Sequence, residues 1–208
     1  FDQVAQAMGG GMSITGSDAA NPVRAGIPIG DLGGGMFGVM GILAALYERE
    51  RSGVGQHVDI SMLDCQISML NYMATMHFLS GEDPYPIGNS HFVHVPYNTF
   101  SCSDGSIVIA VITDNFWQYL KELIDCPVFD DSKYDTQPGR WEDRDMINNT
   151  LNDVFSRNTC QFWLAQLEAK RIPCAPVNSL SQALSDEQVL HRNMVVDLKH
   201  PDGSQTKG

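Results

Sequence analysis

The segment that constrains this chain most runs from Pro28 to Gly53, where an aspartate and three consecutive glycines open the most strongly apolar helical pattern in the sequence. Apolar side chains recur at helical spacing at positions 36, 39, 40, 43, 46 and 47, which predicts a helix over about residues 32–52 with one buried stripe. Arg49, Arg51 and Gly53 supply the cations and the glycine that favour a helix end. We therefore expect the fold to be built around a long helix that begins beside Asp31.

Asp31 has two interpretations at this position. Aspartate is a preferred N-cap residue, and a cap is the more common role. The free N–H groups and the dipole of a helix start also favour a carboxylate that attacks an acyl group, because donors for the developing oxyanion are nearby. A cap does not require Gly33, Gly34 and Gly35, each of which weakens the first turn by up to about 1 kcal/mol relative to alanine. Glycines would let a ligand's carbonyl approach the backbone, so they favour a functional site.

The bulk composition is that of an ordinary globular chain and disfavours several partners. Hydrophobic residues make up 43% of the 208 residues and charged residues 18%, as in soluble globular proteins. The formal net charge of −12 disfavours nucleic acid and anionic membranes, both of which favour clustered lysine and arginine. No uninterrupted run of about 18 apolar residues occurs, so no membrane-spanning segment is expected.

Five cysteines, at positions 65, 102, 126, 160 and 174, form no CxxC pair and leave one over. This pattern indicates neither a zinc site nor a disulfide framework, and we expect no bound metal. Reduced thiols favour an intracellular location, the cytoplasm first, with a mitochondrion or a peroxisome as the alternative in a eukaryote. The chain begins at Phe1 without an initiator methionine, and we expect a piece of a longer protein rather than a processed product.

The chain changes character at a polar, proline-rich stretch over residues 80–98. Before it, alternation predicts a strand over 57–62, and a methionine-rich helix is expected over 63–79. After it we expect strands over 99–101 and 106–111, helices over 116–124, 145–156 and 160–170, an edge segment over 172–177, a helix over 179–191 and a hairpin from 194. The predicted fold class is α/β, divided into residues 1–79, a connector over 80–98, a small α+β domain over 99–190 and a return segment over 191–208.

These stretches resemble the family III CoA-transferases, which include formyl-CoA and carnitine CoA-transferases and the related 2-methylacyl-CoA racemases. The resemblance is carried by FDQVAQAMGG at the start, GDLGGG around Asp31, AALYER, GVGQHVDISM, GN with His91, Pro96-Tyr97, Asp104-Gly105, RWEDR and IPCAPV. Their order and spacing hold over nearly all of the chain. The resemblance implies a protein roughly twice as long, with a Rossmann-like large domain formed by both chain ends, an inserted small domain and an interlocked homodimer. It also implies that the isolated chain is inactive, because most contacts to the adenine and phosphates of coenzyme A precede Phe1.

The resemblance further implies that Asp31 is a nucleophile. It would attack an acyl-CoA thioester to give a mixed anhydride, form an aspartyl-CoA thioester with the released thiolate, and pass coenzyme A to a small carboxylic acid through a second anhydride. Backbone N–H groups at Gly33, Gly34 and Gly35 would meet the oxyanions. No cofactor other than coenzyme A, as acyl-CoA substrate, is implied.

Two alternatives to CoA transfer come from the same residues. The racemases of this family pair their aspartate with a histidine thirty residues earlier, where this chain has Phe1, and phenylalanine cannot move a proton, so transfer is favoured. The second alternative is a non-catalytic fragment or a module that binds coenzyme A or another subunit. An intact Asp31 with its glycines argues against degeneration, and the implied missing half argues for a fragment.

Four further positions are candidates for substrate contacts. His91 and Tyr97 lie in or beside the connector that passes near the acyl pocket in the family, and could contact the acceptor's carboxylate; a solvated loop histidine is the alternative. Arg140 and Arg144 could bind an acidic substrate, but ion pairs with Glu142 and Asp143 are the preferred interpretation.

Overall fold

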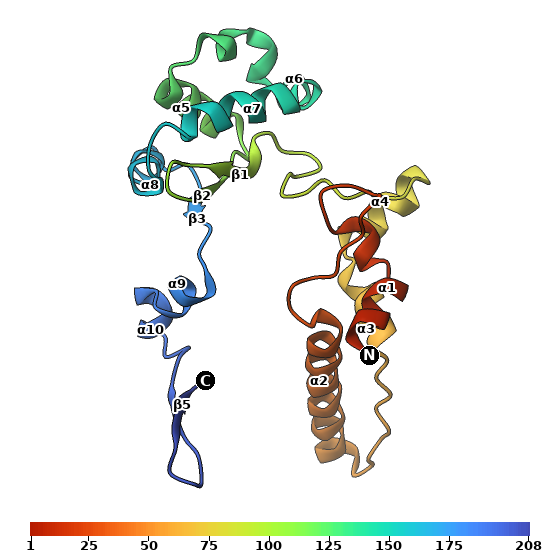
Figure 1. Ribbon diagram of the computed structural model, residues 1–208. Helices are drawn as coiled ribbons and strands as arrows, with labels where there is room; N and C mark the ends of the chain where they lie inside the picture. The colour runs from red at the N-terminus through yellow and green to blue at the C-terminus, as the bar shows by residue number, and fades with distance from the viewer. The chain divides into compact units, whose positions relative to one another are not determined.

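The computed structural model describes residues 1–208, which form two compact units, Phe1–Phe92 and Val93–Gly208. The first unit is helical (Figure 1). It contains α1 (Asp2–Met8), the 3-10 turn η1 (Gly11–Ile14), α2 (Ile29–Ser52), α3 (Met62–Met69) and α4 (Tyr72–Ser80). The boundary between the units falls within the segment 80–98 predicted as a connector, while the four-part domain division stays a prediction.

The long helix predicted over 32–52 is confirmed as α2, which begins three residues earlier, at Ile29. It ends where the sequence indicated, because Gly53 adopts the left-handed conformation (φ 72°) and donates its N–H to the Arg49 carbonyl at 2.8 Å. The methionine-rich segment forms two short helices, α3 and α4, since Asn71 between them has a positive φ of 51°.

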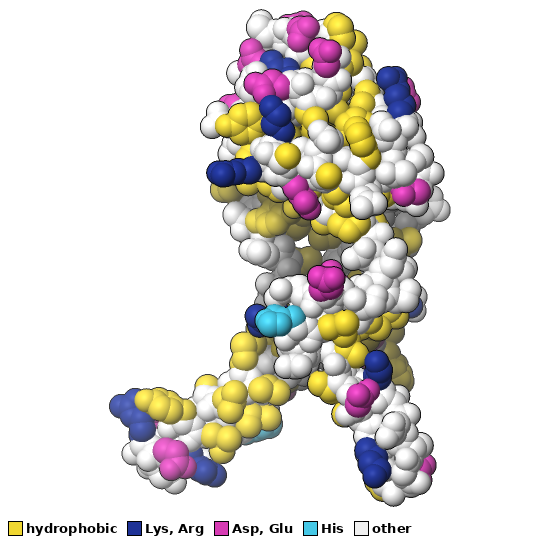
Figure 2. All heavy atoms as spheres, turned by 90° about the vertical axis from the view of Figure 1, so that its left-hand side faces the viewer, with side chains coloured by type: hydrophobic (Ala, Val, Ile, Leu, Met, Phe, Trp, Pro, Cys, Tyr) yellow, Lys and Arg dark blue, Asp and Glu magenta, His cyan; other side chains and the backbone are white.

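The apolar stripe of α2 is not buried, which corrects the prediction. Only Gly30 and Gly33 of this helix are buried, whereas Met36, Leu43 and Tyr47 are 55%, 60% and 70% exposed. The reason is that the first unit offers α2 only the short helices α1 and α3 and one extended segment as neighbours. Figure 2 shows patches of hydrophobic side chains on the surface of the chain.

The same helix also revises the expectation that no segment is apolar enough to cross a membrane. By length and composition alone α2 meets that criterion, with a mean hydropathy of 1.6, a criterion that core helices of soluble proteins also meet.

The strand predicted over 57–62 does not form, and the segment is extended without a partner strand. It runs back beside α2 (Figure 1). Val58 and Ile60 lie against glycines of α2: a Cβ built on Gly41 would be 2.7 Å from Val58 Cγ1, and one on Gly38 would be 3.9 Å from Ile60 Cγ1. The alternation therefore records packing of one side against a helix and not membership of a sheet.

The second unit is an α+β module, as predicted. Strands β1 (Tyr97–Ser101), β2 (Ser106–Ala110) and β3 (Cys174–Pro176) form an antiparallel sheet in the order β1-β2-β3, so the proline-containing β3 lies at an edge as expected. The helical elements are α5 (Asp114–Ile124), η2 (Pro127–Asp130), η3 (Ser132–Asp135), α6 (Gln137–Glu142), α7 (Arg144–Phe155) and α8 (Cys160–Ala169).

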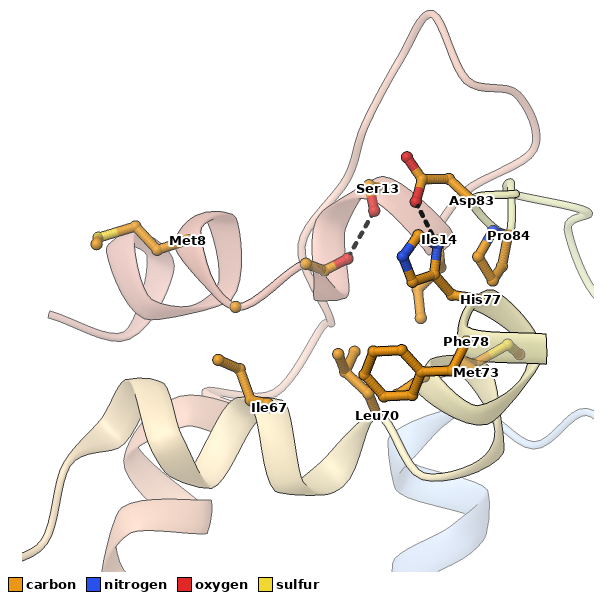
Figure 3. Close-up of a pocket in the computed structure, with 13 residues that line it drawn as sticks. Met8, Ser13, Ile14, Ile67, Leu70, Met73, His77, Phe78, Asp83 and Pro84 are labelled. Carbon is orange, nitrogen blue, oxygen red and sulfur yellow. Dashed lines mark hydrogen bonds and ion pairs between the residues drawn. The ribbon is translucent and has the colours of Figure 1, made fainter. Parts of the chain in front are cut away.

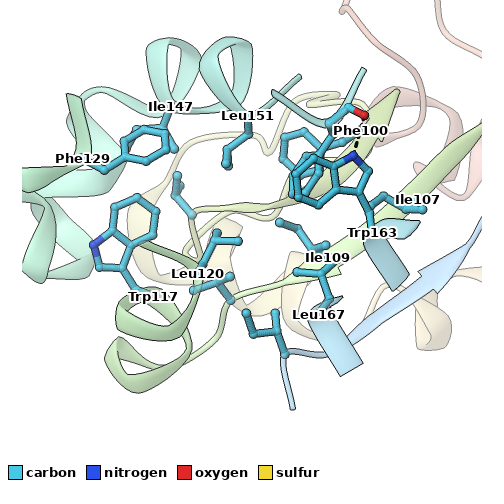
Figure 4. Packing of buried hydrophobic residues seen from close by; sticks show 14 of the residues in the cluster. Phe100, Ile107, Ile109, Trp117, Leu120, Phe129, Ile147, Leu151, Trp163 and Leu167 are labelled. Carbon is cyan, nitrogen blue, oxygen red and sulfur yellow. Dashed lines mark hydrogen bonds between the residues drawn. The ribbon is translucent and has the colours of Figure 1, made fainter. Parts of the chain in front are cut away.

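Nearly all of the buried hydrophobic side chains belong to this second unit. Its core joins the inner face of the sheet to α5, α7 and α8 (Figure 4), with Phe100, Ile107, Ile109, Trp117, Leu120, Leu151, Trp163 and Leu167 among its members. In the first unit only Ala5 and Cys65 are buried hydrophobic residues. The second unit therefore holds the chain's hydrophobic core.

The chain closes with two short helices and a hairpin. The predicted helix over 179–191 is divided into α9 (Leu180–Leu184) and α10 (Glu187–His191), because Asp186 starts a new helix by accepting from the N–H groups of Gln188 and Val189. The predicted hairpin is confirmed as β4 (Asp197–Lys199) paired with β5 (Gln205–Lys207).

Candidate functional site

Asp31 is the third residue of α2 and does not cap it. The N-cap position is Pro28, which has no side-chain acceptor, and the start of α2 has no side-chain cap of its own. The Asp31 side chain is exposed to solvent. The capping interpretation of Asp31 is therefore wrong, and its carboxylate lies at a helix N-terminus where the dipole favours negative charge.

The acceptor at this helix start is a distant carboxylate, that of Asp2 in α1. The Gly30 N–H donates to Asp2 Oδ1 at 2.9 Å. The Gln6 side-chain amide donates to Asp2 Oδ2 at 2.9 Å. Burial raises the pKa of the Asp2 carboxyl, but these hydrogen bonds and the charge of Arg24 outweigh it and hold the pKa below its ordinary value.

Gln6 connects this arrangement to the loop that precedes α2. It is 2% exposed, and its Oε1 accepts from the Ala25 N–H at 2.9 Å while its Nε2 holds Asp2. This network could not be predicted from a local sequence pattern. Asp2 and Gly30 are 28 residues apart, and a hydrogen bond over that separation produces no periodic pattern of residues.

The three glycines after Asp31 have different surroundings. A Cβ on Gly33 would lie 2.6 Å from Met69 Cε, so Gly33 lets α3 approach α2. A Cβ on Gly34 would lie 3.4 Å from Met62 Cγ, and one on Gly35 would meet nothing within 4 Å. Gly34 and Gly35 stand three and four residues after Asp31 and share its helix face. The absent side chains leave open space one turn beyond the Asp31 carboxylate.

The backbone of these glycines belongs to the helix itself. Within a regular α-helix the N–H groups of residues 33–35 donate to the carbonyls four residues earlier. The N–H groups left over are those of the first turn; Asp2 accepts that of Gly30, and the Ile27 carbonyl accepts that of Ile29. Stabilisation of oxyanions by the glycine N–H groups stays a prediction.

An apolar pocket of about 360 Å³ lies elsewhere in the first unit (Figure 3). Its only charged pair is His77 and Asp83, whose Nδ1 and Oδ1 atoms are 3.0 Å apart. The remaining lining comes from the end of α1, η1, α3 and α4: Met8, Gly9, Gly10, Ser13, Ile14, Ile67, Leu70, Met73, Ala74, Phe78 and Pro84. Asp31 does not line this pocket, so the pocket gives no support to an acyl site at Asp31.

The substrate contacts proposed for His91 and Tyr97 stay predictions. His91 is half-buried in the last residues of the first unit, and Tyr97 is half-buried at the start of β1, opposite Ala110. The two residues therefore belong to different units.

Arg140 has a structural role, which corrects its predicted pairing. It is fully buried and donates to the Val95 carbonyl at 2.8 Å, the Tyr134 carbonyl at 2.7 Å and Asp114 Oδ1 at 2.8 Å. Its guanidinium also lies 5.2 Å from the Trp117 ring centroid. An arginine so enclosed cannot bind a substrate.

Neighbouring charges pair differently from the prediction as well. Lys133, and not an arginine, holds Glu142 and Asp143, at 3.1 and 2.8 Å. Arg144 lies 3.5 Å from Asp145 and 4.6 Å from the Trp141 ring centroid. All five cysteines are free thiols, and no three potential metal-ligating side chains form a cluster.

Comparison with known proteins adds to this geometry. The family model described as CoA-transferase family III matches residues 1–208. The chain is 34% identical over 205 residues to a succinyl-CoA:mesaconate CoA-transferase of Haloarcula hispanica, covering 99% of this chain and 51% of that protein. It is 33% identical over 202 residues to a succinyl-CoA:glutarate CoA-transferase of Mus musculus, covering 97% of this chain and 46% of that protein.

A solved structure shares the mixed α/β fold. The crystal structure of a CAIB/BAIF family protein from Brucella suis matches with a TM-score of 0.85 and 28% identity, over 99% of this chain and 57% of that one. The chain spans about half the length of the curated relatives it matches.

Proposed function

The chain belongs to CoA-transferase family III, and on that premise we propose that the protein to which it belongs moves coenzyme A from an acyl-CoA thioester to a carboxylic acid, with Asp31 as the nucleophile. The observation that carries the proposal is the state of the Asp31 carboxylate. It is exposed at the start of α2, is not used as a cap, and has open space beside it at Gly35.

The proposed reaction consists of four acyl exchanges. An oxygen of Asp31 attacks the thioester carbonyl carbon, and the C–S bond breaks to release coenzyme A as a thiolate. The thiolate attacks the Asp31 carbonyl carbon of the resulting anhydride, which releases the donor acid as a carboxylate and leaves an aspartyl-CoA thioester. The acceptor carboxylate then displaces the thiolate, and the thiolate attacks the acceptor's carbonyl carbon and frees Asp31. Each step exchanges one acyl bond for another, so no proton or oxidant is consumed.

We propose short dicarboxylic acids as the substrate class. This rests on the relatives, whose names specify succinyl-CoA with mesaconate or glutarate. We further place the first unit in a Rossmann-like large domain of an interlocked homodimer, as the family resemblance implies. Activity would require the longer protein, and His91 and Tyr97 remain candidates for the acceptor's carboxylate.

Racemisation of a 2-methylacyl-CoA is less well supported. It needs a second base to return the α-proton on the opposite face, and the position thirty residues before Asp31 is Phe1. In D₂O the full-length enzyme should therefore transfer coenzyme A without placing deuterium at the α-carbon, as judged by mass spectrometry of the recovered thioester.

The test of the nucleophile is to trap the acyl-enzyme of the full-length protein. Succinyl-CoA followed by hydroxylamine should convert Asp31 into a hydroxamate, detectable in its peptide by mass spectrometry. Asp64→Asn is the matched control, because Asp64 is likewise an exposed aspartate in the third position of a helix, α3. We expect Asp31→Asn to abolish both label and transfer, and Asp64→Asn to retain both. Transfer by Asp31→Asn at more than about a hundredth of the wild-type rate would show that the covalent mechanism is wrong.

A further inference from the structure

The start of α2 has no side-chain cap of its own, and the only local acceptor is the Ile27 carbonyl, which takes the Ile29 N–H at 2.8 Å. The first N–H groups of a helix need acceptors from outside it, and Ser, Thr, Asp or Asn at the N-cap normally provides one. Here the N-cap is Pro28, which has no such side chain. The helix that carries Asp31 therefore depends on a group from another element to fix its first turn.

Asp2 is that group, and its bond is to the residue directly before Asp31. It accepts from the Gly30 N–H at 2.9 Å, and the backbone of Asp31 is close enough to help lower the pKa of the Asp2 carboxyl. The carboxylate is itself oriented, because the Gln6 amide donates to its second oxygen at 2.9 Å and Gln6 is buried and bonded to Ala25. α1, the preceding loop and the first turn of α2 are thus joined through one carboxylate.

From this arrangement we propose that Asp2 is a positioning residue for the reaction: it fixes the backbone of Asp31 and occupies the anion position at the start of α2, which leaves the Asp31 carboxylate available for substrate. The inference rests on the proposed role of Asp31 as nucleophile. Asp2 acts through Asp31 and need not touch the substrate. Since a reacting group displaced by about 1 Å can cost on the order of 100-fold in rate, loss of the bond to the Gly30 N–H, next to Asp31, should appear in kcat.

The chain contains a matched control for this carboxylate. Asp18 accepts two backbone N–H groups, from Ala20 at 2.9 Å and Asn21 at 3.0 Å, and one side-chain amide, from Asn21 at 2.9 Å. All of these bonds lie within an exposed loop, and none reaches α2. The Ser17 hydroxyl also donates to Asp18, at 3.3 Å, so Asp18→Ala removes at least as many hydrogen bonds as Asp2→Ala without disturbing the nucleophile.

The experiment compares Asp2→Ala, Asp2→Asn and Asp18→Ala in the full-length enzyme. We measure kcat, KM for succinyl-CoA, and the rate at which hydroxylamine captures Asp31. Asp2→Ala should lower kcat and the capture rate by about tenfold or more with KM little changed. Asp2→Asn, whose amide oxygen still accepts one N–H, should fall between Asp2→Ala and wild type. Asp18→Ala should match the wild-type rate.

The results separate this inference from the proposed function. If wild type forms no hydroxamate at Asp31, both are overturned. If wild type is labelled at Asp31 and the Asp2 variants are labelled as fast as Asp18→Ala, only the positioning role is overturned. Should Asp2→Ala fail to fold, Asp2→Asn and Gln6→Met decide the question. Each must lower kcat at unchanged KM, and an unchanged kcat overturns the proposal.

Discussion

Two carboxylates at the start of α2 have different surroundings, although the sequence marks only one of them. Asp31 lies in the first turn and faces solvent, while Asp2 comes from another helix and accepts the first-turn N–H group of Gly30. An aspartate that caps its own helix has its oxygens bound by that helix. Because a second acid takes that role, the Asp31 carboxylate has no such bond to break before it can react.

The lowered pKa of Asp2 predicts a pH dependence of stability. An acid whose pKa is lowered by folding stabilises the folded state above its ordinary pKa, and this contribution is lost as the pH falls through the lowered value. Asp2→Asn should therefore melt at a lower temperature than wild type at neutral pH, and the difference should close below pH 3.8, the ordinary value for this carboxyl. Thermal unfolding followed across this range tests the prediction, and a difference that persists unchanged in acid contradicts it.

The buried Arg140 side chain should contribute to the stability of the second unit. Arg140→Met would leave the Val95 and Tyr134 carbonyls without their donor inside the second unit. An unsatisfied buried polar group costs about 1–3 kcal/mol, so we expect a loss of about 3 kcal/mol in the free energy of unfolding. Arg144→Met is the control, because Arg144 also lies over a tryptophan beside an aspartate but near the surface; its loss should stay within about 1 kcal/mol. Urea unfolding compares them, and equal losses would contradict the structural role of Arg140.

At the scale of elements, substitution of a glycine of α2 by alanine should raise the stability of the protein at one position, Gly35, and lower it at another, Gly41. Gly35→Ala places a methyl group in open space and should stabilise the helix by up to about 1 kcal/mol. It should nevertheless slow CoA transfer, because the methyl group stands one turn beyond Asp31 on the same face. Gly41→Ala would place Cβ 2.7 Å from Val58 Cγ1, and crowding of this kind typically costs about 1–3 kcal/mol. Melting temperatures and kcat of the full-length variants check both effects, and a destabilised Gly35→Ala would contradict the account of that face.

Element prediction succeeded where the signal was local. The period of α2 and the glycine after it predicted the helix and its end, and the strands predicted over 99–101 and 106–111 correspond to β1 and β2. The prediction of a strand over 57–62 was wrong, because alternation of polar and apolar residues indicates burial of one side but does not identify the neighbouring element, which is α2. One continuous helix was predicted over 179–191, because helical periodicity does not reveal a second N-cap such as Asp186 within the amphipathic segment.

For the candidate site, too, only features formed by residues close together in sequence were predicted. Asp31 and its glycines were found because they are adjacent in sequence. The Asp2 contact and the contacts of Arg140 with Val95 and Asp114 were not found, since they join residues 26 to 45 positions apart and depend on how elements pack. The burial of α2 was predicted wrongly. An apolar stripe indicates that a helix face packs against other residues, but it does not indicate that those residues lie among these 208.

At the scale of the whole molecule, the two units should differ in stability. The hydrophobic core belongs to the second unit, whereas the first buries only Ala5 and Cys65 among its hydrophobic residues. Amide hydrogen exchange of the 208-residue chain should therefore be slow in β2 and fast in α2. In the longer protein we expect α2 to become protected, because its exposed apolar face is then covered. Equal protection of α2 and β2 in the 208-residue chain would contradict this.

The bond between Asp2 and the start of α2 also bears on how sequences of this kind can diverge. The position of Asp31 is set by contacts at the two ends of a loop, and the residues between, such as Asp18 to Arg24, are exposed. Doubling the length of a flexible loop adds only about 0.6 kcal/mol of closure entropy. Insertions and deletions in this loop can therefore accumulate while the reactive carboxylate stays in register, so related chains are best aligned by the two anchor points and not by the count of residues between them.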